Sequence, residues 1–138
     1  MSEESQVTKE EKIKKIQQLR EKGIEPYPYS FEADTQIGAL RKEFDYLESE
    51  QKTGRIVRLA GRIVSRRAMG KILFMNLVDE DAQIQLFFRE NELGDQFNIA
   101  ETIDIGDIVG ASGEVFKTKT GELSVWVQGF SILNKSIT

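Results

Sequence analysis

Phe74 and Gln85 are residues whose types and spacing point to chemistry. They lie in two runs, 72–78 and 83–89, where apolar and other residues alternate, a pattern that predicts two strands. The opposite parity of each run is apolar and forms the predicted core face, made of Leu73, Met75, Leu77, Ile84, Leu86 and Phe88. Phe74 and Gln85 therefore share the face away from the core. An exposed ring stacks on an unpaired base, and a glutamine amide offers a base edge one donor and one acceptor side by side.

Charged groups are expected next to this ring and amide. Glu122 begins the last predicted strand, and its carboxylate only accepts, so it would pair with a ring N–H or an amino group. Arg66 and Arg67 end the first predicted strand, and a guanidinium only donates, so it would pair with a carbonyl or a phosphate. Uracil fits this set because two carbonyls flank one N–H. Arg67 has the parity of the core face, so a bend at Gly61 or the strand end must turn it outward.

Each residue also has a structural interpretation. A single exposed phenylalanine such as Phe74 often covers a neighbouring element, Gln85 could be solvated, and Glu122 could cap a turn. Phe87 and Trp126 are expected to pack under the N-terminal helix or the arm that follows it, outside the site. The site hypothesis therefore depends on the joint occurrence of these residues on one face.

A basic stretch borders the same face. Residues 52–71 contain seven basic and no acidic residues, whereas the whole chain of 138 residues has a net charge of −4. The seven are Lys52, Arg55, Arg58, Arg62, Arg66, Arg67 and Lys71. A local basic patch on an acidic protein can place a phosphate backbone on one side of the molecule. The alternative is a strand whose solvent face is rich in arginine.

Missing residue types narrow the function classes. The chain has no cysteine and no histidine, so disulfides, thiolate metal sites and imidazole catalysis are excluded. No apolar run approaches the roughly 18 residues of a membrane span, and the polar start is not a secretory signal. We therefore expect a cytoplasmic protein with no catalytic residues, no metal and no cofactor of its own, and an enzyme acting alone is the weakest alternative.

The remaining elements follow from capping and periodicity. Residues 1–7 are expected to be disordered, and a capping box at Thr8 starts a lysine-rich helix that ends near Gly23. Residues 26–31 form an extended arm, and a second helix is expected at 36–47. Together they make an N-terminal helical extension, residues 1–54.

Residues 55–135 predict a mainly β domain. Strands are expected at 55–66, 71–79, 83–89, 107–116 and from about 122, with a tight hairpin at 79–82. The connection 91–103 is irregular or a short helix, and Gly110 and Gly113 interrupt the fourth strand. Five bent strands with an insertion between the third and fourth indicate a five-stranded OB-fold barrel. An SH3-like barrel and a small open sandwich are the alternatives.

Three segments resemble a known family. GRIVSRRAMGK at 61–71, FKTKTGELS at 116–124 and the upstream KIQQLREKGIEPYPYSF at 15–31 are similar to the N-terminal anticodon-binding domain of class II lysyl-tRNA synthetases. The resemblance covers about residues 9 to 135. It implies an OB-fold that grips the tRNA anticodon and stacks the middle base, a uridine, on a phenylalanine of the second strand.

The resemblance assigns roles to individual residues. Phe74 would be the stacking ring, Gln85 would read the uridine edge, Arg67 would contact the same base, and Glu122 would lie near a neighbouring anticodon base. Contacts with the tRNA backbone are expected from Arg58, Arg62, Arg66, Lys71, Lys117, Lys119, Lys12 and Lys15.

The resemblance also implies a larger parent enzyme. That enzyme would be a homodimer that attaches lysine to its tRNA, with ATP and Mg bound in a catalytic domain. No motif of the form G-x-G-x-x-x-R occurs here, so we expect this chain to lack the catalytic domain and to be inactive alone, as a monomer or weak dimer. Its partner would be the anticodon stem-loop of tRNA(Lys). A sequence-tolerant single-strand binder and an OB scaffold for protein interaction, anchored by Phe74, remain as alternatives.

Overall fold

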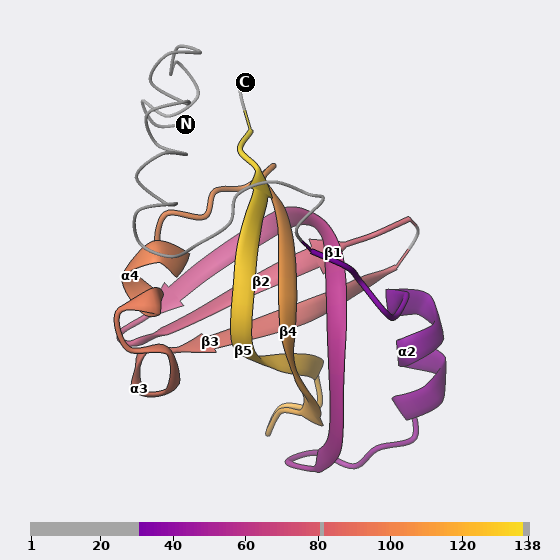
Figure 1. Ribbon diagram of the computed structural model, residues 1–138. Helices are drawn as coiled ribbons and strands as arrows, with labels where there is room; N and C mark the ends of the chain where they lie inside the picture. Colours follow the sequence, from indigo (N-terminus) through magenta and orange to yellow (C-terminus); the bar gives the residue numbers. More distant parts are fainter. Residues whose placement is uncertain (1–30, 81, 137–138) are drawn as a thin grey trace, which may run out of the picture.

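The computed structural model describes residues 31–80 and 82–136 (Figure 1). The predictions for residues 1–7, for the helix that starts at Thr8 and for most of the arm lie outside these ranges. The described elements are α2 (Ile37–Phe44), β1 (Lys52–Met69), β2 (Ile72–Val78), β3 (Gln83–Arg89), α3 (Glu90–Leu93), α4 (Gln96–Ala100), β4 (Ile108–Lys117) and β5 (Leu123–Asn134).

The strands close into a barrel in the order β1-β2-β3-β5-β4. All neighbouring strands are antiparallel except β3 and β5, which are parallel. Together with the helical insertion between β3 and β4, this is the five-stranded OB-fold predicted from the sequence. The SH3-like barrel and the open sandwich are therefore wrong alternatives for this chain.

The predicted core faces are confirmed. The apolar parity of β2 and β3 points into the barrel, where Leu73, Met75, Leu77, Ile84, Leu86 and Phe88 are buried together with Leu123, Val125 and Val127 of β5. The hairpin at 79–82 is present, with the Asp79 amide donating to the Ala82 carbonyl at 3.2 Å. The expected short helical connection is the α3–α4 pair.

Helices cover the two ends of β3 (Figure 1). α2 begins where the Ile37 amide donates to Asp79 Oδ2 at 2.7 Å, and it buries Ile37, Leu40 and Phe44 in the same core as the strands. The α3–α4 pair lies at the other end and buries Leu93 and Phe97. The second predicted helix is thus confirmed, although it is shorter than 36–47. The division of the chain at residue 55 stays a prediction.

Close strand contacts explain two glycines. A Cβ on Gly61 would lie 2.3 Å from the Val78 carbonyl oxygen, and one on Gly113 would lie 2.0 Å from that of Trp126. The prediction that Gly110 and Gly113 interrupt the fourth strand is wrong, because β4 runs without a break through both. Gly113 lets the β5 backbone approach closely, and a Cβ on Gly110 would lie 2.7 Å from the Phe31 ring, but neither glycine ends the strand.

A β-bulge reverses the parity of β1. Ile63 pairs with Leu77, but Ser65 pairs with Asn76, so Val64 is an extra residue. After the bulge, residues 65, 67 and 69 share the outer face with Phe74. The bend expected at Gly61 is therefore placed at 63–65, and it is this bulge that turns Arg67 outward.

Candidate functional site

One row of side chains crosses the outer face of the barrel. Arg67, Phe74, Phe87 and Trp126 are successive cross-strand partners on β1, β2, β3 and β5. The ring centroids of Phe74 and Phe87 are 5.3 Å apart, and those of Phe87 and Trp126 are 5.1 Å apart. Strand pairing therefore makes a continuous aromatic surface whose first ring, Phe74, is half-buried.

Arg67 lies at one end of this row. Its guanidinium carbon is 4.8 Å from the centroid of the Phe74 ring, a cation–π distance. The side chain is exposed and makes no hydrogen bond or ion pair with the described residues. The structure thus brings Arg67 and Phe74 together, and the donors of Arg67 stay available for an acceptor beside the ring.

A second row holds the polar residues. Asn76, Gln85 and Ser124 are cross-strand partners on β2, β3 and β5, two residues along each strand from the aromatic row and on the same face. Gln85 Nε2 donates to Ser124 Oγ at 3.0 Å, and Ser124 Oγ donates to the Glu122 carbonyl at 3.1 Å. Gln85 is therefore next to Phe74 with its amide held. Parity does not distinguish Asn76 and Ser124 from solvated residues, and sequence reasoning missed them.

Glu122 lies at the edge of the same face, just before β5. It is exposed, and its Oε2 is 3.9 Å from Arg41 Nη1 of α2. Arg41 also donates to the Gln83 carbonyl at 3.1 Å, which holds it at the start of β3. An exposed pair at this distance is weak, so the Glu122 carboxylate can still accept from another donor. Sequence reasoning missed Arg41, because this residue lies on α2, outside the basic stretch 52–71.

The aromatic row widens around Trp126. The Phe116 ring of β4 lies 5.7 Å from Phe87 and 5.3 Å from Trp126, centroid to centroid. Lys52 Nζ is 4.5 Å and the Arg89 guanidinium 5.5 Å from the Trp126 ring. Phe87 and Trp126 thus pack against each other and Phe116. The expectation that they pack under the N-terminal helix or the arm, outside the site, stays a prediction, because, of these two segments, only Phe31 lies within the described ranges. The Trp126 indole N–H is buried and has no hydrogen-bond partner among residues 31–80 and 82–136.

The predicted backbone-binding arginines are not gathered beside Phe74. Each donates to a main-chain carbonyl elsewhere: Arg58 Nε to Glu32 at 2.7 Å, Arg62 Nη1 to Gly106 at 2.8 Å and Arg66 Nη2 to Glu101 at 2.9 Å. Arg66 pairs with Met75 after the bulge, so it lies on the opposite parity from Arg67 and reaches the end of α4. The expectation that Arg66 shares the face of Phe74 is therefore wrong.

The predicted backbone-binding lysines lie in two loops. Lys71 is exposed at the β1–β2 turn, 3.7 Å from Glu90 Oε1. In the β4–β5 loop, Lys119 is exposed, whereas Lys117 Nζ donates to the Leu47 carbonyl at 2.9 Å and the Asp45 carbonyl at 3.3 Å. Lys12 and Lys15 lie outside the described residues.

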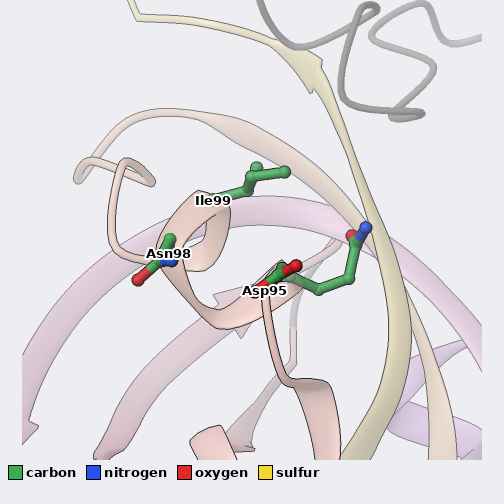
Figure 2. Close-up of a pocket in the computed structure, with 4 residues that line it drawn as sticks. Asp95, Asn98 and Ile99 are labelled. Atoms are coloured by element: carbon green, nitrogen blue, oxygen red, sulfur yellow. The ribbon is translucent and has the colours of Figure 1, made fainter.

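Other features of the described residues do not compete with this face. Residues 31–80 and 82–136 hold no group of three or more metal-ligating side chains, and no helix among them has the length and hydropathy of a membrane span. A pocket at α4, shown in Figure 2, is lined by Asp95, Gln96, Asn98 and Ile99. None of these residues belongs to the outer rows.

The fold and this face define a class of protein. Residues 57–133 match the family of OB-fold nucleic acid binding domains, and the chain belongs to that family.

Similar proteins carry a more particular name. The chain is 41% identical over 128 residues to a lysine–tRNA ligase of Methanoculleus marisnigri, covering 91% of this chain and 25% of the relative. It is 40% identical over 131 residues to the lysine–tRNA ligase of Syntrophomonas wolfei, and this match covers 94% of this chain and 26% of the relative. It is 41% identical over 131 residues to the chloroplastic/mitochondrial lysine–tRNA ligase of Arabidopsis thaliana, and this match covers 91% of this chain and 22% of the relative. The predicted resemblance is confirmed, and the chain spans about a quarter of the length of these relatives.

Proposed function

We propose that this chain is the anticodon-binding module of a lysyl-tRNA synthetase and that it recognises the uridine-rich anticodon of tRNA(Lys). The observation that carries the proposal is the placement of Arg67, Phe74 and Gln85 side by side on one outer barrel face. The lysine–tRNA ligases to which the chain is about 40% identical support the choice of tRNA.

Each group has a defined task in this proposal. The middle base of the anticodon stacks on the Phe74 ring, which is worth roughly 1–3 kcal/mol per base. Gln85 and Arg67 bond the edge of the same base, because an amide accepts from a ring N–H and a guanidinium donates to a carbonyl. Glu122 accepts from a neighbouring base. Discrimination comes from these edge contacts, since stacking alone tolerates any base.

Backbone contacts supply affinity without sequence information. Lys71 and Lys119 are the exposed candidates in the loops that border the face, and Arg58, Arg62, Lys117, Arg66, Lys12 and Lys15 remain predicted contacts. The chemistry of joining lysine to tRNA, with ATP and Mg, belongs to the parent enzyme. We place that homodimeric enzyme in the cytoplasm and expect this chain alone to be a monomer or weak dimer.

The test is a binding comparison between two RNA stem-loops. The chain is titrated with an anticodon stem-loop bearing UUU and with one bearing UCU, at one stated salt concentration. The proposal predicts roughly tenfold or greater preference for UUU, because cytosine presents an acceptor where uracil presents an N–H. Equal affinity for the two loops would instead favour a sequence-tolerant single-strand binder. No binding of either loop would favour an OB scaffold for protein interaction.

A further inference from the structure

We propose that Ser124 is a positioning residue for base recognition, because it fixes which end of the Gln85 amide faces the nucleic acid. This inference rests on the proposed function, and it adds the mechanism by which an amide that can donate or accept is made to act as an acceptor. Ser124 is buried, so it reads no base itself and works through Gln85.

The order of hydrogen bonds starts from a main-chain carbonyl. The Glu122 carbonyl accepts from Ser124 Oγ at 3.1 Å and from the Thr118 amide at 3.0 Å. The Glu122 amide donates in turn to Thr118 Oγ1 at 3.0 Å, so the β4–β5 turn holds this carbonyl in place. A serine hydroxyl has one hydrogen. Once Ser124 donates it to Glu122, its oxygen can only accept from Gln85.

This order sets the polarity of Gln85. Its Nε2 donates to Ser124 Oγ at 3.0 Å, towards β5. Its Oε1 is turned away from Ser124 and makes no hydrogen bond with the described residues. A fixed acceptor beside the Phe74 ring suits the N3–H of uracil, whereas cytosine has an acceptor at N3 and meets it with repulsion. Without the Ser124 hydroxyl, the amide can turn by half a rotation and offer its NH₂ to cytosine.

The test is a double-mutant cycle on base discrimination. Affinities for the UUU and UCU stem-loops are measured for the wild-type chain, Ser124→Ala, Gln85→Ala and the double variant. Ser124→Ala is expected to narrow the UUU/UCU affinity ratio by roughly 3- to 10-fold, the value of one hydrogen bond, with UUU binding weakened more than UCU binding. In the Gln85→Ala background, the same serine change is expected to leave the ratio unaltered.

Two controls separate positioning from general stability. Ser112→Ala removes a half-buried hydroxyl of β4 that donates to the Gly129 carbonyl at 3.4 Å, and it should leave the UUU/UCU ratio at its wild-type value. Ser124→Thr keeps the hydroxyl and should retain most of the ratio. Should Ser124→Ala fail to fold, NMR of the wild-type chain decides. Contacts between the Gln85 amide protons and Ser124 are expected to persist when the UUU loop binds, and their loss on binding would overturn the proposal.

The outcomes distinguish this inference from the proposed function. Suppose that the wild-type chain prefers UUU, that Ser124→Ala keeps the full preference and that Gln85→Ala loses it. This result overturns the role of Ser124 but leaves the proposed function standing. The inference would also be overturned if Ser124→Ala narrowed the UUU/UCU affinity ratio equally in the wild-type and Gln85→Ala chains, because Ser124 would then act independently of Gln85. A wild-type chain with no preference overturns base reading as a whole, and this inference with it.

Discussion

At the scale of single residues, Arg66 and Arg67 are adjacent in the sequence but serve different surroundings. Arg67 lies over the Phe74 ring on the outer face, whereas Arg66 donates to the Glu101 carbonyl at the end of α4. The difference arises because successive side chains of a strand point to opposite faces. Substituting each arginine in turn therefore separates the effect of the position of Arg67 from the effect of removing one positive charge.

Arg67→Ala is expected to lower affinity for the UUU stem-loop by roughly tenfold, the value of a hydrogen bond to a charged group. Arg66→Ala removes the same charge from the next position and is the matched control, with an expected loss of no more than about threefold. Fluorescence titration at one salt concentration measures both. Equal losses from the two variants would mean that Arg67 contributes charge only.

Parity was sufficient to find Phe74, Gln85 and Glu122, because each lies on a strand or strand end with a clear core face. It could not find Ser124 or Phe116. Ser124 acts through a hydrogen bond to Gln85 on another strand, which alternation does not encode. Phe116 joins the aromatic row through the pairing of β4 with β5, which sequence periodicity does not give. Residue-level roles thus depended on strand pairing.

At the scale of elements, the geometry of β1 positions the site. The bulge at 63–65 turns Arg67 outward, and Gly61 allows β1 to approach β2 closely just before it. Hydropathy alternation predicted the strands and their core faces, because burial on one face imposes a period of two. It could not locate the bulge, since an extra valine inside a strand keeps the local composition unchanged.

Gly61→Ala is expected to destabilise the chain by about 1–3 kcal/mol or more, because its Cβ would lie 2.3 Å from the Val78 carbonyl oxygen. Gly129→Ala is the control, since its Cβ would lie 3.2 Å from Ser112 Oγ, which can move. Urea unfolding followed by circular dichroism gives both free energies of unfolding. Similar small changes for the two variants would contradict the close packing of β1 on β2.

Leu40→Ala tests whether α2 folds with the barrel. Leu40 is fully buried in the common core, so its truncation should cost about 2–5 kcal/mol in one unfolding transition. Lys42→Ala, on the exposed side of the same helix, should change the free energy of unfolding little. A Leu40→Ala variant with wild-type barrel stability would show that α2 is an independent extension.

Asp34 predicts a dependence of stability on pH. Its pKa lies below the usual value because its carboxylate accepts from the Arg58 amide at 2.9 Å and from Thr35 Oγ1 at 2.7 Å. A lowered folded-state pKa contributes stability above the unfolded value, which is lost as the pH falls through the folded one. Asp34→Ala should therefore be less stable than wild type at neutral pH and converge with it in acid. A difference that does not depend on pH in urea unfolding would contradict this contact.

At the scale of the whole molecule, charge is distributed unevenly. The net charge is −4, but residues 52–71 contain no acidic side chain, so the basic groups of β1 and the β1–β2 turn stand apart from an acidic remainder. This distribution was readable from the sequence, but the engagement of Arg58, Arg62 and Arg66 with carbonyls was not, because those partners are far away in the chain.

Salt should separate backbone contacts from base contacts. The logarithm of UUU stem-loop affinity is expected to fall linearly with the logarithm of salt concentration, by about 0.7 per phosphate contact on a single strand. The UUU/UCU affinity ratio should stay constant, because the two loops have the same phosphate contacts and salt therefore weakens the binding of both equally. Titrations at several salt concentrations measure both quantities. An affinity insensitive to salt would contradict the role of the basic stretch.

The most direct measurement of the central claim is the affinity of Phe74→Ala for the UUU and UCU stem-loops, beside wild type and Ile72→Ala. Ile72 lies on the same outer face of β2 and is half-buried, so it controls for loss of apolar surface. We predict that Phe74→Ala weakens UUU binding by roughly 10- to 100-fold. It should also abolish the preference for UUU, because Gln85 and Arg67 can read the edge of the base only while the ring holds that base beside them. Ile72→Ala should change neither quantity by more than about threefold. Unchanged UUU affinity and preference in Phe74→Ala would contradict the assignment of this face to the anticodon.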